Sequence, residues 1–442
     1  MKISISGIRG IYGNNDLGLQ DIAKYSRLFG SFISKDKKDK KDCIVARDTR
    51  PSSNIILRIV IAGLLEQGFQ IYNLDVAPTP IVFRESKMRK SGIIVTASHN
   101  PLEWNGLKFI IDGRGLFEDD LTSFLSSTIQ PFIQSGELFN THSNYISDLV
   151  ALLEKNGYLN NEKKNISVDL GGGAACNYAV KLFKMLCDKV YSINDVESIS
   201  SRSPDPTTDS LNELRELVRI NKSEIGLAFD MDGDRLVIVN DDGIKLTPDS
   251  TLLLCVASTL SHGLRRYVTS IDTSNAVENV IKSYGGSLAY SKVGESNVVK
   301  NIIDSNFDAG GEGSSGGFIL PNFTMCRDGL LAGAIISTMD KKMRDECLLM
   351  AKKYTQIRSK IPIKSNFHNP IVEKIQSKFK DSYQILTLDG IKVLIDENSW
   401  VLVRPSNTED VLRVSVESEP SNVHSLYKET TEKVQNIYEQ IK

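Results

Sequence analysis

The sequence predicts an α/β layer fold, in which three similar passages are followed by a shorter C-terminal unit. Short apolar runs typical of buried strands alternate with longer segments that have one apolar face, as helices do. This alternation starts again near residue 166 and near residue 247. After Ile361-Pro362 only short strands and one long helix are expected. Three similar passages indicate internal duplication.

The first passage shows the alternation most clearly. Helices are expected at residues 19–33 and 53–67, where the apolar positions fall on one face. Strands are expected at residues 43–46, just before Ala77-Pro78, and at residues 92–95. A polar helical region near residues 118–160 closes the passage.

The remaining passages repeat this order. In the second, strands are expected at 166–170, 225–229 and 236–239, with a helix at 174–186. In the third, a strand is expected at 267–271 and helices at 251–260, 275–284 and 330–339. The C-terminal unit is expected to hold short strands, including 411–417, and a final helix at 421–441.

Composition excludes several classes of protein. The chain has 442 residues, of which 40% are hydrophobic and 24% charged, as in ordinary globular proteins. A net charge of −2 argues against a nucleic-acid partner. No apolar run is long enough for a membrane helix or a signal peptide, so no membrane partner is expected. The six cysteines include no C-x-x-C pair, and we expect reduced thiols in a cytoplasmic protein.

The segment TASHNP, residues 96–101, follows an expected buried strand. Ser98 is therefore predicted to lie on a tight loop at the carboxyl end of that strand, where open α/β sheets bind ligands. A serine there, with His99 beside it, suggests a nucleophile or a phosphate carrier. When this segment is taken alone, an ordinary turn is the favoured interpretation. The other polar segments favour the chemical interpretation.

Three aspartates, Asp230, Asp232 and Asp234, alternate along the chain after another expected strand. Extended backbone would point all three carboxylates the same way, with Gly233 easing the bend. Such a cluster suits a hard divalent cation, and Mg²⁺ keeps places for phosphate oxygens or water. The loop is no EF-hand, because the glutamate at position twelve is absent. A solvated acidic turn would leave three close negative charges uncompensated.

The segment RPSNTE, residues 404–409, offers groups that suit a phosphate dianion. Arg404 supplies a guanidinium fork, Ser406 and Thr408 supply hydroxyls, and Asn407 stands between them. Arg413 could add charge from the next strand. A surface turn is the alternative.

Two further sets of polar residues extend this pattern. Glu312 and Ser314 lie among glycines and suit sugar hydroxyls, because a carboxylate accepts hydrogen bonds from neighbouring OH groups. Arg9, between two glycines, and Lys108 could supply a charge clamp or a base near Ser98. A flexible glycine turn and exposed surface charges are the alternatives.

Together these segments resemble the α-D-phosphohexomutases, the phosphoglucomutase/phosphomannomutase superfamily, which includes phosphoglucosamine mutases. The resemblance spans nearly the whole chain, and the motifs occur in the family's order. The matching segments are GIRG at 7–10, RDTRPSS at 47–53, TASHNP at 96–101, NGLKF at 105–109, DMDGDR at 230–235, KVGE at 292–295, GEGSS at 311–315 and RPSNTE at 404–409.

The resemblance implies three related α/β domains and a smaller C-terminal α+β domain around a central cleft. We place their limits at residues 1–145, 146–245, 246–360 and 361–442, which carry the phosphoserine, metal, sugar-binding and phosphate-binding loops in that order. It further implies that Ser98 is a phosphoserine and that one Mg²⁺ is held by this serine with Asp230, Asp232 and Asp234.

The resemblance also implies roles for the other polar residues. Glu312 and Ser314 match the sugar-recognition loop, and Arg404, Ser406, Asn407 and Thr408 fall in the loop that grips the non-reacting phosphate. The remaining active-site contacts would be Arg9, His99, Lys108, Arg235 and Lys292, with Lys108 as the general base. The chain departs from the family at Asn407, where glycine is usual, at Ser315-Gly316-Gly317, where many relatives have a histidine, and in a shortened N-terminal motif.

The predicted activity is phosphoryl transfer between O1 and O6 of a hexose phosphate through a 1,6-bisphosphosugar, which also serves as activator. Mannose, glucose and glucosamine phosphates all fit, and a pentose phosphate is possible. A serine-dependent sugar-phosphate phosphatase and a non-catalytic sugar-phosphate sensor are the alternatives. The sequence leaves the oligomeric state open.

Overall fold

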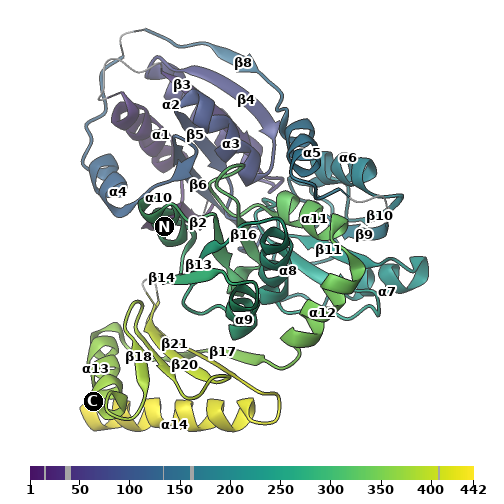
Figure 1. Ribbon diagram of the computed structural model, residues 1–442. Helices are drawn as coiled ribbons and strands as arrows, with labels where there is room; N and C mark the ends of the chain where they lie inside the picture. Colours follow the sequence, from purple (N-terminus) through teal and green to yellow (C-terminus); the bar gives the residue numbers. More distant parts are fainter. Residues whose placement is uncertain (14–15, 35–40, 133, 160–163, 407–408) are drawn as a thin grey trace.

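The computed structural model describes residues 1–13, 16–34, 41–132, 134–159, 164–406 and 409–442. These residues form four sheets, each with helices packed against it (Figure 1). The first three sheets contain parallel strands joined through helices, and the fourth is antiparallel. The α/β class with a smaller α+β unit is therefore confirmed.

The first sheet contains eight strands in the order β1-β2-β6-β5-β3-β4-β8, with β7 paired to β6. Its strands are β1 (Lys2–Ser4), β2 (Gly7–Ile11), β3 (Asp42–Arg47), β4 (Gln70–Val76), β5 (Ser91–Val95), β6 (Trp104–Ile111), β7 (Arg114–Gly115) and β8 (Leu138–Asn140). Its helices are α1 (Leu19–Ile33), α2 (Ser53–Glu66), α3 (Thr79–Arg89) and α4 (Glu118–Leu125). Val45 and Ile93 lie in the apolar cluster that includes α1 and α2, whereas Ile44 and Ile94 lie in the cluster with α3, because successive strand residues point to opposite faces.

The second and third sheets have four strands each. The second holds β9 (Asn165–Asp169), β10 (Lys189–Ile193), β11 (Ile225–Phe229) and β12 (Leu236–Asn240), with α5 (Tyr145–Lys155), α6 (Cys176–Leu186) and α7 (Asn212–Asn221). The third holds β13 (Arg266–Ser270), β14 (Ser287–Ser291), β15 (Ala309–Glu312) and β16 (Gly317–Ile319), with α8 (Pro248–Ser261), α9 (Asn275–Ser283), α10 (Glu295–Ser305), the 3-10 turn η1 (Gly313–Ser315), α11 (Gly329–Thr338) and α12 (Lys341–Ala351).

One strand arrangement recurs in all three sheets. The orders β4-β3-β5-β6, β10-β9-β11-β12 and β14-β13-β15-β16 each join three parallel strands to one antiparallel strand. The loop before the antiparallel strand holds Ser98 in the first sheet, the three aspartates in the second and Glu312, at the end of β15, in the third. The repeated passages thus place three chemically distinct loops at equivalent positions.

The fourth sheet has the order β17-β21-β20-β19-β18, and every neighbouring pair is antiparallel. Its elements are β17 (Thr355–Pro362), β18 (Gln384–Leu386), β19 (Ile391–Leu394), β20 (Trp400–Pro405) and β21 (Val411–Ser418), with η2 (Ser365–Phe367), α13 (His368–Phe379) and α14 (Val423–Ile441). The domain limits stay a prediction. The expected limit at 360/361 falls inside β17, and the limit at 145/146 falls inside α5.

Buried polar contacts attach the fourth sheet to the third. Lys392 is fully buried, donates from Nζ to the Ile271 carbonyl at 2.8 Å and lies 4.1 Å from the centroid of the Trp400 ring. Glu417 accepts a hydrogen bond from the Asn275 backbone at 2.7 Å. These contacts fix the position of β20 and β21 beside the third unit.

In the part of the chain that the structure describes, no helix combines the length and apolar character needed to cross a membrane. All six cysteines are buried free thiols, as expected from their spacing.

Candidate active site

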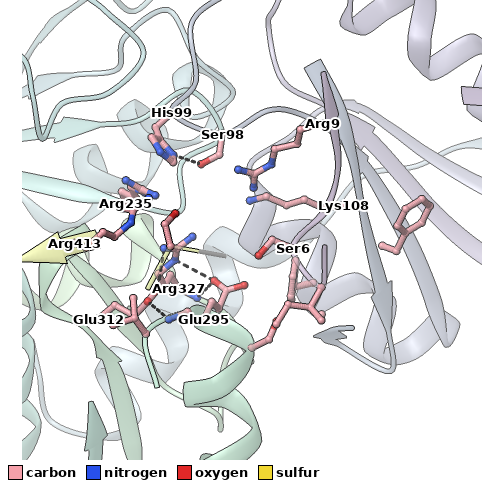
Figure 2. Close-up of a pocket in the computed structure, with 18 of the residues that line it drawn as sticks. Ser6, Arg9, Ser98, His99, Lys108, Arg235, Glu295, Glu312, Arg327 and Arg413 are labelled. Carbon is pink, nitrogen blue, oxygen red and sulfur yellow. Dashed lines mark hydrogen bonds and ion pairs between the residues drawn. The ribbon is translucent and has the colours of Figure 1, made fainter. Parts of the chain in front are cut away.

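A cleft of about 390 Å³ lies where the four units meet (Figure 2). Arg9 and Lys108 point into it from the first sheet, opposite Arg235 and Arg413. Most of the residues predicted from sequence line this cleft: Arg9, Ser98, His99, Lys108, Arg235, Glu312, Arg404, Ser406 and Arg413. Polar groups from all four units therefore surround one cavity.

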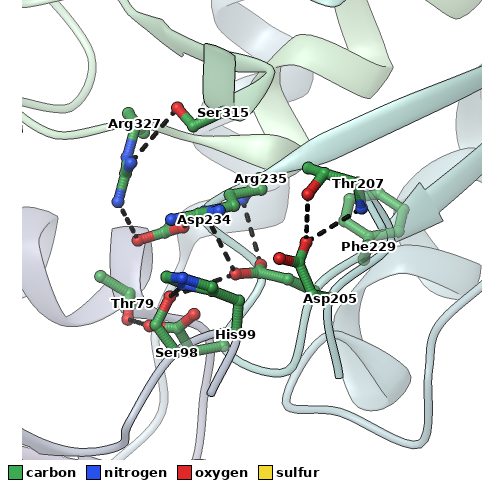
Figure 3. Close-up of polar contacts among 12 residues, drawn as sticks. Thr79, Ser98, His99, Asp205, Thr207, Phe229, Asp234, Arg235, Ser315 and Arg327 are labelled. Carbon is green, nitrogen blue, oxygen red and sulfur yellow. Dashed lines mark hydrogen bonds and ion pairs between the residues drawn. The ribbon is translucent and has the colours of Figure 1, made fainter. Parts of the chain in front are cut away.

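Ser98 lies three residues after the end of β5, on a turn with a strained backbone. Its φ of 54° lies in the left-handed region, which non-glycine residues rarely adopt. The Thr96 hydroxyl accepts a hydrogen bond from the Ser98 backbone at 2.8 Å and helps to hold this conformation. The Ser98 hydroxyl lies 3.3 Å from His99 Nδ1 and 3.3 Å from Asp230 Oδ2, so it faces the aspartate loop (Figure 3).

The fully buried Arg50 holds the serine loop from behind. Its guanidinium donates to the carbonyls of Ser98 at 2.5 Å, Asn100 at 2.7 Å and Pro101 at 2.5 Å. Asp48 accepts from Arg50 Nε at 3.0 Å and balances its charge. The RDTRPSS segment thus shapes the loop that carries the serine, without lining the cleft itself.

The three aspartates converge, although not in the expected way. Residues 230–235 form a turn, in which Gly233 has a φ of +69° and its N–H donates to the Asp230 carbonyl, so the prediction of extended backbone is wrong. Turning brings one carboxylate oxygen from each of Asp230, Asp232 and Asp234 within 4.8 Å of one another. All three side chains are fully buried.

This cluster fits a divalent cation. Within the described chain, Oδ1 of Asp232 and Oδ1 of Asp234 are buried and accept no hydrogen bond. Buried carboxylate oxygens without partners are costly unless a cation binds them. Burial and the neighbouring Asp232 and Asp234 raise the pKa of Asp230. The all-oxygen donor set is the one that Mg²⁺ prefers.

Lys108 already contacts the cluster from the first sheet. Its Nζ donates to Asp232 Oδ2 at 2.6 Å and to Asp234 Oδ2 at 3.0 Å. Burial alone would lower the pKa of Lys108, but the two carboxylates outweigh it and raise that pKa. His99 differs, because burial, with Arg235 and Arg9 nearby, lowers its pKa to about 2. His99 is therefore a neutral hydrogen-bond partner for Ser98.

Glu312 lies at the end of β15 and is held on both oxygens. Its Oε1 accepts from the Gly294 backbone at 2.7 Å, and its Oε2 accepts from Arg327 Nη1 at 3.0 Å. Burial raises the pKa of Glu312, which Arg327 partly offsets. Of the other residues predicted to contact substrate, Ser314 is half-buried and Lys292 exposed, and neither lines the cleft.

The fourth unit contributes two arginines on neighbouring strands. Arg404 of β20 and Arg413 of β21 are paired in register, and both line the cleft with Ser406. Arg404 Nη1 lies 3.5 Å from Asp389. The predicted contacts Asn407 and Thr408 lie outside the described residues.

Comparison with known proteins assigns nearly the whole chain to one family. Family models described as "Phosphoglucomutase/phosphomannomutase, alpha/beta/alpha domain I", domain II, domain III and C-terminal domain match residues 1–130, 143–243, 247–355 and 360–432, respectively. A probable phosphoglucosamine mutase of Methanosphaera stadtmanae is 31% identical over 98% of both chains. The chain belongs to the phosphoglucomutase/phosphomannomutase family. Its members are phosphohexomutases, and the predicted class of enzyme, an isomerase that acts by intramolecular phosphoryl transfer, is confirmed.

Further phosphohexomutases resemble the chain over nearly its full length. A phosphoglucosamine/phosphogalactosamine mutase of Sulfurisphaera tokodaii is 30% identical, covering 94% of this chain and 95% of the relative. The solved structure of a family protein from Burkholderia thailandensis superposes with a TM-score of 0.84 at 23% identity, covering 99% of this chain and 98% of that one, which supports the fold.

Some residues of this candidate site were not predicted. Arg327 and Glu295 line the cleft, and Thr79 donates to Asp232 Oδ2 at 2.7 Å. Glu295 stands in the KVGE segment, where Lys292 was expected to reach the site. Arg327 directly precedes Asp328, the N-cap residue of α11. Charged residues are common beside the start of a helix, so the sequence gave no reason to assign Arg327 to the site.

Proposed function

We propose that this phosphohexomutase interconverts the 1-phosphate and 6-phosphate of a hexose through a phosphoserine at Ser98 and a 1,6-bisphosphosugar. One arrangement carries the proposal. The Ser98 hydroxyl lies 3.3 Å from the aspartate cluster, in the same cleft as Glu312 and the arginines of the fourth unit. Names of relatives favour glucosamine phosphate as the substrate, and glucose and mannose phosphates remain to be compared with it.

In the first transfer, the bond between phosphorus and Ser98 Oγ breaks while a bond forms to the free sugar hydroxyl. The hydroxyl proton would pass to Lys108, the proposed general base, once Mg²⁺ on Asp232 and Asp234 offsets the negative charge that raises the pKa of Lys108. The Ser98 oxygen left behind would take up a proton in turn. Arg9 and Arg235 line the cleft near Ser98 and would bind the transferring phosphoryl oxygens. Mg²⁺ on the three aspartates would neutralise charge on that group.

The second transfer requires the bisphosphosugar to turn over within the cleft. The bond between the other phosphorus and its sugar oxygen would then break while a bond forms to Ser98 Oγ, and the serine proton would end on that sugar oxygen. The product would leave carrying the phosphate that it received in the first transfer. Arg404, Ser406 and Arg413 would hold whichever phosphate is not reacting, since they line the side formed by the fourth unit. Glu312 would accept hydrogen bonds from the sugar hydroxyls in either orientation.

The experiment supplies glucosamine, glucose and mannose 1-phosphates separately, with Mg²⁺ and a trace of the matching 1,6-bisphosphate. We expect the 6-phosphate isomer as product and no net inorganic phosphate. Release of inorganic phosphate would instead identify a phosphatase. If neither the 6-phosphate isomer nor inorganic phosphate forms, the protein would be a sugar-phosphate sensor without catalytic activity.

The Ser98→Ala variant tests the covalent step directly. We expect turnover to fall by about 10³-fold or more, because the phosphate carrier is gone. Sugar-phosphate binding, measured by calorimetry, should stay close to that of the unmodified protein. Near-normal turnover in this variant would exclude Ser98 as the carrier.

A further inference from the structure

Arg327 contacts more acidic groups than its position before α11 would require. Its backbone N–H and its Nε donate to Glu295 Oε2 at 3.0 and 3.1 Å. Its Nη1 donates to Glu312 Oε2 at 3.0 Å and to Ser315 Oγ at 3.3 Å, and its Nη2 donates to Asp234 Oδ2 at 3.0 Å (Figures 2 and 3). Every nitrogen of the guanidinium is therefore engaged.

The three carboxylates come from separate elements. Asp234 lies in the turn of the second unit, Glu295 begins α10, and Glu312 ends β15. Asp234 also accepts from Lys108 of the first sheet, so Arg327 completes a chain of ion pairs from Lys108 to Glu312. A guanidinium can bridge three acidic groups because its donors point in fixed, different directions, whereas an ammonium acts as a single point charge.

Because Gly317 has no side chain, the Arg327 side chain can pack directly against the backbone at position 317. A Cβ added at Gly317 would lie 2.2 Å from Arg327 Cδ and 2.6 Å from its Cγ. The next nearest atom is Ser315 Oγ at 3.1 Å. No backbone atom is among these neighbours, so an alanine at 317 would displace the Arg327 side chain and leave β16 in place.

We propose that Arg327 is a positioning residue that fixes the Glu312 carboxylate for the sugar hydroxyls and ties that carboxylate to the aspartate cluster. Gly317 maintains the arrangement by leaving space for the guanidinium. The inference rests on the proposed function, since it concerns how the same cleft recognises the sugar.

The physical consequence is a fixed acceptor. Glu312 receives one hydrogen bond on each oxygen, from Gly294 and from Arg327, and each oxygen keeps a lone pair for a substrate hydroxyl. Without Arg327, the Glu312 carboxylate would keep the hydrogen bond from Gly294, lose the one from Arg327, and rotate. A site that no longer presents its acceptor loses its discrimination against sugars that lack the matching hydroxyl.

The test compares a parent hexose 1-phosphate with its 3-deoxy and 4-deoxy analogues in four proteins. These are the unmodified enzyme, Arg327→Lys, Gly317→Ala and the control Arg84→Lys. Arg84 also bridges separate segments, donating to Asp148 and to the Phe323 carbonyl, but it does not line the cleft. The quantity measured is the factor by which kcat/KM falls when the hydroxyl is removed.

In the unmodified enzyme we expect a fall of about 10²-fold or more for at least one analogue. In Arg327→Lys and in Gly317→Ala that factor should shrink by about 10-fold, whereas Arg84→Lys should keep it. A purely structural role would lower kcat/KM for the parent sugar and the analogues alike, because only a residue coupled to the hydroxyl changes their ratio.

Two outcomes would overturn the inference while leaving the proposed function intact. One is an unchanged deoxy penalty in both Arg327→Lys and Gly317→Ala, and the other is the absence of any penalty in the unmodified enzyme. Failure of all parent sugars to isomerise would instead defeat the proposed function. Gly317→Ala keeps Arg327 in the sequence, so it tests the contact even where Arg327→Lys does not fold.

Discussion

Lys108 belongs to the first α/β unit and forms ion pairs with the aspartate turn of the second. Its positive charge bears on both the stability of the fold and the proposed chemistry. Three buried carboxylates, Asp230, Asp232 and Asp234, lie within reach of Lys108, Arg235 and Arg327. Removing one partner of a buried ion pair leaves an uncompensated charge, which costs about 3–5 kcal/mol. The cations around the turn therefore stabilise the fold as well as serving the proposed chemistry.

Substitution of Lys108 separates its charge from its capacity to accept a proton. In Lys108→Arg the positive charge stays, but arginine does not deprotonate, so kcat should fall by about 10²- to 10⁴-fold. The unfolding temperature should change little. Lys108→Met should lose activity and also unfold at a markedly lower temperature. If Lys108→Arg kept the kcat of the unmodified enzyme, Lys108 would be a charge clamp and some other group the base.

At the scale of single elements, the sequence predicted long periodic helices well and helices that begin inside motifs poorly. The limits of α1, α2 and α14 agree with expectation to within two residues. By contrast, α3 and α10 were not predicted, because Ala77-Pro78-Thr79-Pro80 and the KVGE segment resemble turns. Proline suits the first turn of a helix as well as a loop, and only packing decides between them.

The start of α11 offers a prediction about pH. Asp328 caps this helix, accepting from the Leu331 backbone at 3.0 Å, from the Tyr145 hydroxyl at 2.7 Å and from the Thr324 hydroxyl at 3.0 Å. Burial nevertheless raises the pKa of Asp328 to about 6. The native carboxyl therefore binds more protons than the unfolded one between about pH 4 and pH 6, and this stabilising contribution is lost as pH rises through 6.

Comparison of the unmodified protein with Asp328→Asn isolates this contribution. The quantity of interest is the unfolding free energy of the unmodified protein minus that of Asp328→Asn. We expect this difference to be smaller at pH 8 than at pH 5, by about 1 kcal/mol. Chemical unfolding of both proteins at the two pH values measures it, and titrations elsewhere cancel in the difference. An advantage that grows with pH would mean that the native carboxyl has a depressed pKa.

At the scale of the whole molecule, the repeated sheet explains how distant motifs form one site. Ser98 and the three aspartates could be assigned from sequence to the ends of strands, and the three similar passages indicated internal duplication. The contacts between units could not be predicted in this way. Arg327 bridging Asp234 and Glu312, or Arg50 holding the Ser98 loop, depends on how separate sheets pack, and no local pattern encodes that.

The same architecture separates the two ends of the proposed substrate. Ser98 belongs to the first unit and Arg404 to the fourth, so one phosphate would react while the other is held across the cleft. If a single distal group serves both orientations, Arg404→Ala should weaken binding of the 1-phosphate and of the 6-phosphate alike. Loss of one charge-assisted contact predicts about a 10-fold or larger rise in each dissociation constant.

The measurement is calorimetric titration of both isomers into Ser98→Ala and into Ser98→Ala/Arg404→Ala, because removal of the serine prevents turnover during the titration. Lys428→Ala in the same background is the control, since Lys428 is an exposed residue of α14 in the same unit and lies outside the cleft. A loss confined to one isomer would show that Arg404 recognises only one orientation, and the second phosphate would then need another holder.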